Sequence, residues 1–148
     1  MPKLQFHFGN ISKARLSTCH PDLQMILNKA IQISNVDFGI AEGHRSVKLQ
    51  QQYFKEGKSK IDGITKLGKH NKAPSEAVDI YVWMNNAVSY DTESLSYLAG
   101  LIYAVGEMLF EQGVVTHHIR WGGNWDDDGV ILIDQSFDDR PHIELVNL

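Results

Sequence analysis

The sequence predicts an α+β fold in which a small antiparallel sheet is flanked by three main helices. The 148 residues correspond in length to one domain. Two segments carry apolar residues at helical spacing and a third is ended by a glycine, whereas other short segments are rich in β-branched and aromatic residues. These helices and strands do not alternate regularly, which favours an α+β fold over a doubly wound sheet.

The three helices are expected at Pro21–Ser34, Val47–Glu56 and Asp91–Gln112. Proline is favourable at the first position of a helix, and glycine typically follows the last. Pro21 opens the first of these segments, and Gly57 and Gly113 follow the other two. The buried side of the longest helix is expected to comprise Leu95, Leu98, Ala99, Ile102, Val105, Met108 and Leu109.

Five short apolar segments are expected to form strands, namely Val36–Ala41, Ala77–Trp83, Thr116–Trp121, Val130–Ile133 and His142–Val146. The stretch from Lys55 to Pro74 is dominated by Gly, Lys and Ser and is expected to be a long loop within the domain. Loops of this length without secondary structure are uncommon and tend to carry function.

The composition excludes several classes of protein. The formal net charge of −4 argues against a nucleic-acid-binding protein, which usually presents a basic face. No apolar run is long enough for a signal peptide or a membrane span, so we expect synthesis in the cytoplasm and no membrane insertion. The single cysteine, Cys19, cannot form an internal disulfide and is expected to be a packing residue.

Asp79 interrupts the apolar strand sequence AVDIYV. A carboxylate in such a strand is costly unless it is paired or bound to a metal. One interpretation is a buried aspartate that caps a loop or pairs with a cation. The other is a metal site, because His70 ends the long loop and His142 begins the last strand. Two imidazoles and one carboxylate are a common zinc-binding set, and catalytic sites leave the fourth position open.

A further carboxylate close to such a metal could act as a general base. Asp138, Asp139 and Glu144 all lie near His142 in the sequence, and spacing alone does not choose among them. Arg45 follows Gly43 at the end of a predicted strand and could bind a substrate carboxylate or stabilise an oxyanion. A surface arginine is the alternative interpretation.

The other histidines are weaker metal candidates. His117 and His118 point in opposite directions on a predicted strand, so at most one of them could face the site. His7, His20 and His44 have no partner at metal-ligand spacing and are expected to be ordinary surface or packing residues.

The segment NWDDDGVILIDQ suggests a second type of metal site. Asn124, Asp126 and Asp128 alternate and are followed by Gly129, as at the start of a calcium loop. The twelfth position is Gln135 instead of a bidentate glutamate. An acidic β-turn is therefore the alternative to a calcium site.

Four segments, taken in order, resemble one family of zinc peptidases. They are GHRSVKLQQQYFKEGKS, KHNKAPSEAVDI, RWGGNWDDDG and FDDRPHIEL. The family contains D-alanyl-D-alanine carboxypeptidases and dipeptidases and the phage L-alanyl-D-glutamate endolysins. The segment FGNISKARLSTCHPDLQMILNKAI also resembles the opening of the phage enzymes. The resemblance implies the D-alanyl-D-alanine peptidase/hedgehog-like fold, with zinc at the face of the sheet.

The same resemblance implies a role for each matching residue. It places the zinc ligands at His70, Asp79 and His142. It places the general base at Asp139, and an arginine that binds the substrate carbonyl and stabilises transition-state charge at Arg45. Gln50 and Ser59 match recurrent polar positions and are expected to bind substrate. Eight residues separate His70 from Asp79, a longer connection than is common in the family.

The resemblance therefore predicts a zinc-dependent endolysin that cuts the L-Ala–D-Glu bond of the peptidoglycan stem peptide. We expect one catalytic domain over residues 1–148, with no separate cell-wall-binding domain, that acts as a monomer. It would be made in the cytoplasm of a phage-infected host and act on the cell wall after release, causing lysis. A D-Ala-D-Ala carboxypeptidase is one alternative. A non-catalytic module that binds zinc or calcium is another.

Overall fold

The computed structural model of the protein describes residues 4–123 and 139–147. Within these ranges the helices are α1 (Asn10–Leu16), α2 (Pro21–Ile33), α3 (Val47–Lys55) and α4 (Thr92–Glu111), with a 3-10 turn η1 (Lys69–Asn71). The strands are β1 (Phe38–Glu42), β2 (Ala77–Met84), β3 (Ala87–Ser89), β4 (His118–Trp121) and β5 (His142–Val146).

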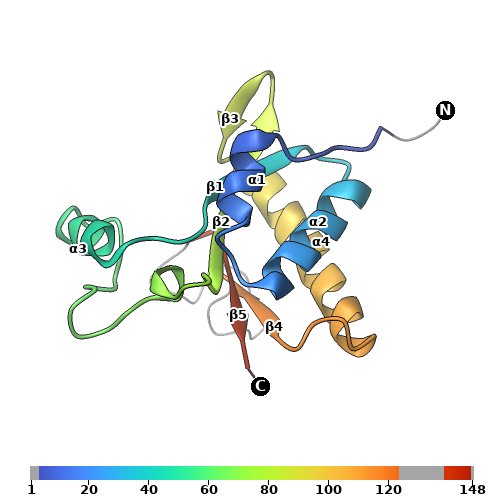
Figure 1. Cartoon of the computed structure of the whole chain (residues 1–148). Helices are drawn as coiled ribbons and strands as arrows, with labels where there is room; N and C mark the ends of the chain where they lie inside the picture. Colours follow the sequence, from blue (N-terminus) through green and yellow to red (C-terminus); the bar gives the residue numbers. More distant parts are fainter. Residues whose placement is uncertain (1–3, 124–138, 148) are drawn as a thin grey trace.

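The strands form one antiparallel sheet in the order β1-β2-β5-β4, and β3 pairs with the end of β2. Helices α1, α2 and α4 gather on one side of this sheet, and α3 stands apart on the other side with the loop that follows it (Figure 1). The predicted α+β fold with an antiparallel sheet is confirmed. The long loop between α3 and β2 is also present, interrupted only by η1.

The core lies between the sheet and helices α2 and α4. Leu23, Ile26 and Leu27 of α2 are fully buried, as are Leu98 and Ile102 of α4. From the sheet, the fully buried side chains are Ile40, Val78, Ile80, Val82, Ile143 and Leu145. Burial of this apolar surface is the main favourable contribution to folding, and it fixes the orientation of β2 and β5.

Two elements were missed by the pattern of the sequence. Helix α1 has only seven residues and no side-chain cap at its start, so it carries few local helix signals. Strand β3 has only three residues and completes a hairpin with β2. The two residues of its turn, Asn85 and Asn86, have φ angles of 54° and 58°, as a two-residue hairpin turn requires.

The predicted boundaries of the described elements agree with the structure to within about two residues, the normal uncertainty of helix and strand ends. The placement of Met108 on the buried side of α4 is wrong, because 59% of its surface is exposed. Ile102, Val105 and Leu109 face the core at helical spacing, whereas Met108 lies outside this row and points to solvent. The predicted strand Val130–Ile133 lies outside the described residues.

Within the described ranges, no helix combines the length and the apolar character needed to cross a membrane. The longest helix, α4, is amphipathic, with its apolar side turned to the core.

The two sides of α4 should differ in their contribution to stability. We expect Leu98→Ala to lower the free energy of unfolding by about 2–5 kcal/mol, because it removes a fully buried side chain and leaves a cavity. Met108→Ala on the same helix should change it by less than about 0.5 kcal/mol. Urea denaturation of both variants tests this, and equal losses would contradict the assigned orientation of α4.

Candidate metal site

The centre of the site is set by the register of three neighbouring strands. Asp79 on β2 lies directly opposite His142 on β5 and Glu42 on β1. Side chains directly opposite one another in an antiparallel sheet lie on the same face. The sheet therefore brings two carboxylates and one imidazole together on the face that α3 and its loop overlook (Figure 1).

His70 reaches this face from η1 and is held there by its own backbone and ring. The ring Nδ1 lies 2.7 Å from the carbonyl oxygen of Gly43, and the carbonyl oxygen of His70 accepts from Arg45 N at 2.7 Å. A carbonyl oxygen can only accept a hydrogen bond, so Nδ1 carries the proton and Nε2 presents a lone pair. Only glycine fits at position 43, because an added Cβ would lie 2.6 Å from the carbonyl oxygen of Arg15.

The ring of His142 is oriented in the same way by a carboxylate. Its Nε2 lies 2.9 Å from Glu144 Oε1, and Arg120 Nη2 lies 2.9 Å from the other oxygen of Glu144. Burial raises the pKa of Glu144, but the His142 hydrogen bond and the Arg120 charge outweigh this effect and lower it. Glu144 is therefore an acceptor and Nε2 of His142 carries a proton, so that in the neutral ring Nδ1 presents a lone pair to the cluster.

The two lone pairs and one oxygen of Asp79 form a nearly equilateral triangle. His70 Nε2 lies 3.2 Å from His142 Nδ1 and 3.3 Å from Asp79 Oδ1, and His142 Nδ1 lies 3.2 Å from the same oxygen. With both rings neutral, the lone pairs of His70 Nε2 and His142 Nδ1 face each other and cannot form a hydrogen bond. A cation placed among them would satisfy all three atoms, so this cluster is compatible with a metal ion.

The burial and the charge of these three residues also favour a bound cation. His70 and His142 are 4% and 8% exposed. Burial raises the pKa of Asp79, but hydrogen bonds to both imidazoles bring it far below its usual value, so the carboxylate is ionised. Burial lowers the pKa of His142, whereas its bonds to Asp79 and Glu144 raise it to about 9, so without a metal Nδ1 also binds a proton, which a metal ion would displace. The cluster thus attracts positive charge.

Asp139 is the second carboxylate at the cluster. Its Oδ2 lies 3.9 Å from His142 Nδ1, and a short backbone network through Gly122 fixes the turn that carries it. Burial raises its pKa, and the negative charge of Asp79 raises it further. Asp139 is therefore a stronger proton acceptor than an ordinary aspartate.

Arg45 lies on the other side of Asp79 and anchors a chain of polar contacts. Its guanidinium forms an ion pair with Glu42, lies 3.6 Å from Asp79 Oδ2, and donates to Gln50 Oε1 at 2.8 Å. Gln50 in turn donates to Ser59 Oγ at 2.8 Å and is almost fully buried. The three residues that the sequence suggested for substrate contacts therefore belong to one network beside the cluster.

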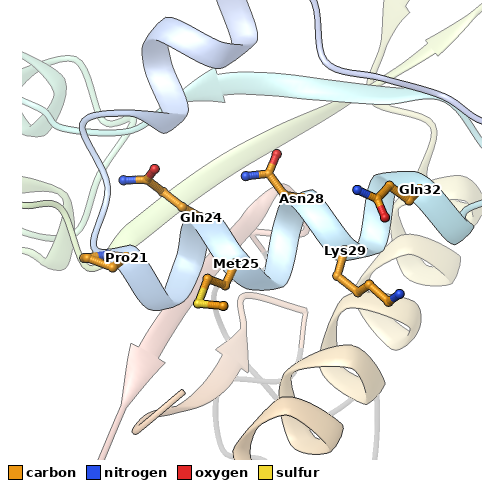
Figure 2. Close-up of a pocket in the computed structure, with 6 residues that line it drawn as sticks. All are labelled: Pro21, Gln24, Met25, Asn28, Lys29 and Gln32. Carbon is orange, nitrogen blue, oxygen red and sulfur yellow. The ribbon is translucent and has the colours of Figure 1, made fainter. Parts of the chain in front are cut away.

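The cluster, Asp139 and the hydrogen-bonded chain of Arg45, Gln50 and Ser59 line one cleft of about 760 Å³. The residues that the sequence singled out in its wall are Arg45, Gln50, Ser59, His70, Asp79, Asp139, His142 and Glu144. A separate depression of about 440 Å³ runs along α2 from Pro21 to Gln32 (Figure 2). Its walls carry amides, one lysine, a methionine and a proline, without a carboxylate or an imidazole, so it lacks the groups that hydrolysis or metal binding needs.

The structure separates the remaining candidates from the cleft. His118 pairs with Glu107 at 2.7 Å, and His117 pairs with Asp22 at the same distance. Cys19 is buried, and burial raises the pKa of its thiol to about 11, which agrees with a packing role. The possible calcium ligands Asn124, Asp126 and Asp128, and Asp138 as a general base, lie outside the described residues.

Two contributors to the site were missed in the sequence. Glu42 follows the last residue of the predicted first strand, and only the pairing of β1 with β2 places it beside Asp79 and Arg45. Tyr53 covers the Arg45 guanidinium, whose central carbon lies 4.7 Å from the ring centroid. The spacing of Tyr53 from Gln50 on α3 is a helical signal that could have identified it.

A half-buried carboxylate, two buried imidazoles and a separate proton acceptor in an open cleft are typical of metal-dependent hydrolases. Comparison with known proteins identifies one family within the metal-dependent hydrolases. The family model for the phage L-alanyl-D-glutamate peptidase matches residues 4–146, and the chain belongs to this family.

An individual relative and a solved structure agree with this assignment. The L-alanyl-D-glutamate peptidase of Escherichia phage T5 is 28% identical over 146 residues, which cover 97% of this chain and all of the relative. The crystal structure of the Serratia marcescens L-Ala D-Glu endopeptidase ChiX superposes with a TM-score of 0.73 at 25% identity. That similarity covers 96% of this chain and 91% of the other.

Glu144 should tune the metal site without contacting the metal. Glu144→Gln keeps the shape but removes the charge that orients His142, so we expect metal affinity to fall by about 10- to 100-fold. Calorimetric titration of the metal-free protein with Zn²⁺ measures this. Glu107→Gln is the matched control, because it removes an equivalent carboxylate–histidine pair at His118. An unchanged affinity in Glu144→Gln would show that the Glu144 charge does not tune the site.

Proposed function

We propose that the protein is a zinc-dependent peptidoglycan hydrolase that cleaves the amide bond between L-Ala and D-Glu of the stem peptide. The observation that carries this proposal is the triangle of His70, Asp79 and His142 with Asp139 beside it in an open cleft. Membership of the phage L-alanyl-D-glutamate peptidase family supports the choice of bond.

The spacing and chemistry of the three ligands support zinc. Zinc bonds of about 2.0–2.1 Å at tetrahedral angles separate two ligand atoms by about 3.3 Å. The observed separations are 3.2–3.3 Å. Neutral imidazole and carboxylate suit zinc better than calcium or magnesium, which prefer a shell of oxygen ligands. The third ligand, Asp79, offsets one of the two zinc charges.

Within the cleft, the residues of the chain divide the steps of hydrolysis. Zinc, when bound, supplies a Lewis acid that polarises the scissile carbonyl and lowers the pKa of water. Asp139 takes a proton from the attacking water and passes it to the leaving amine. Arg45 neutralises the charge that develops on the carbonyl oxygen. Its pairing with Glu42 and its contact with Tyr53 fix the guanidinium before substrate arrives.

Substrate binding is assigned to the side of the cleft formed by α3 and the following loop. Gln50 and Ser59 lie there in a continuous hydrogen-bonded chain with Arg45. Glu144 is the alternative general base from the sequence, but its two oxygens are hydrogen-bonded to His142 and Arg120. Asp139 therefore fits the role of proton acceptor better.

Several finer expectations belong to the same proposal. The enzyme acts as a single catalytic domain and a monomer, is made in the host cytoplasm, and reaches the cell wall after release. Lysis of the host is the biological outcome. Calcium binding by Asn124, Asp126 and Asp128 stays a prediction from the sequence.

Asp139 should be needed for turnover but not for metal binding. We expect Asp139→Asn to reduce kcat by about 10²- to 10⁴-fold, because the amide cannot accept the proton. Zinc content and thermal unfolding should stay close to those of the unchanged protein. Asp37→Asn, which alters a carboxylate outside the cleft, is the control and should retain full turnover. Full activity in Asp139→Asn would exclude it as the general base.

The scissile bond is tested by the products of digestion. Purified protein with zinc should lyse peptidoglycan and release new L-Ala C-termini, detected by mass spectrometry of the fragments. Release of free D-Ala alone would identify a D-Ala-D-Ala carboxypeptidase instead. A protein that holds zinc but hydrolyses no wall fragment would be a binding module.

A further inference from the structure

A second cluster of two imidazoles and one carboxylate lies away from the cleft. It consists of His20 and Asp22 at the start of α2 and His117 just before β4. The ring centroids of His20 and His117 lie 4.9 Å apart, with an interplanar angle of 74°. The corresponding values for His70 and His142 are 5.0 Å and 70°. The two clusters therefore share both their chemical groups and the arrangement of their rings.

One oxygen of the Asp22 carboxylate accepts several hydrogen bonds, and the other accepts none within the described part of the chain. Asp22 Oδ2 accepts from Thr116 N at 3.0 Å and from Thr116 Oγ1 at 3.2 Å, and lies 2.7 Å from His117 Nδ1. Its other oxygen, Oδ1, lies 4.0 Å from His20 Nδ1 and forms no hydrogen bond within the described part of the chain. Burial raises the pKa of Asp22, but these donors lower it overall, so the group is ionised.

The hydrogen bonds also define what each imidazole can offer. An ionised carboxylate only accepts, so Nδ1 of His117 carries a proton when no metal is bound. A metal ion that replaces this proton would bind Nδ1 of His117 and the carboxylate of Asp22 together, so binding releases a proton. Nδ1 of His20 accepts from Asp22 N at 3.0 Å and so caps α2. A metal at His20 must compete with this cap, which makes the cluster a weaker site than the one in the cleft.

We propose that His20, Asp22 and His117 form a second binding site for a divalent transition metal of the zinc, nickel or copper class. Imidazole and carboxylate together select these ions over calcium and magnesium. The side chains of His20 and His117 are 27% and 17% exposed, so an ion can enter from solvent and complete its shell with water. Pro21, between His20 and Asp22, lines the open depression along α2 (Figure 2).

Occupation of this site joins two segments that are distant in the sequence. It links the start of α2 to the residues before β4, which are already connected through Asp22 and Thr116. His20 N also donates to the carbonyl oxygen of Ser75 at 2.8 Å, and Ser75 lies in the connection between His70 and Asp79. Because the ion binds only the folded chain, occupation of the site raises Tm.

Zinc titration by calorimetry tests the proposal, with calcium in excess so that oxygen-ligand sites are filled. The unchanged protein should bind two equivalents of zinc, the second more weakly than the first. His117→Gln should lose the weaker equivalent and keep the tighter one. His20→Asn should also lose the weaker equivalent. Asparagine preserves the N-terminal cap of α2, so this loss of zinc binding cannot be attributed to a disturbed helix. His118→Gln, which alters the neighbouring histidine, should still bind two equivalents.

The outcomes separate this proposal from the proposed function. His142→Ala should lose the tighter equivalent and keep the weaker one, whatever its activity. A single equivalent in the unchanged protein, or two in both His117→Gln and His20→Asn, would overturn the second site. Absence of hydrolysis by a protein that binds two equivalents would instead overturn the proposed function alone. Thermal unfolding of each variant without metal verifies that the fold is retained.

Discussion

The ionised carboxylate of Asp79 is the constraint on which the site depends. It stands between Val78 and Ile80, both fully buried, in the strand that pairs with β1 on one side and β5 on the other. A charge in such a position must be offset by opposite charge or by hydrogen bonds. The structure supplies His70, His142 and Arg45 around it. Each of these groups is then held by a partner of its own, so one charge organises several elements of the fold.

Three carboxylates near His142 acquire different properties from their surroundings. Asp79 is surrounded by cationic or donor groups, which favours its charged form and suits a ligand. Glu144 forms an ion pair with Arg120 and orients the His142 ring through its Nε2 atom, on the side away from Asp79. Asp139 is near another negative charge and partly removed from water, so it binds a proton more readily. The same functional group is therefore available as ligand, as support and as proton acceptor within one cleft.

The sequence contains the local part of this arrangement but not the part that depends on strand pairing. Asp79 is conspicuous within its own strand, and the alternation of β5 predicts that His142 and Glu144 share a face. Helices α2 and α4 follow from apolar periodicity and their end signals, whereas α3 is predicted from the glycine that ends it. Glu42 could not be assigned, because its relation to Asp79 exists only through the register of β1 and β2. For the same reason His20 appeared to have no partner, since His117 reaches His20 and Asp22 only when the residues before β4 lie beside the start of α2.

The long connection between His70 and Asp79 shows why loop length alone is a poor guide to ligand geometry. Both ends of the connection are fixed independently of its length. At one end Gly43 and Arg45 bind the ring and the backbone of His70, and at the other the sheet fixes Asp79. Between them, Ser75 is tied to Thr18 and His20, and Glu76 N donates to the carbonyl oxygen of Lys69. The extra residues are therefore accommodated against the α1–α2 connection, and the lone pair of His70 still points at Asp79 and His142.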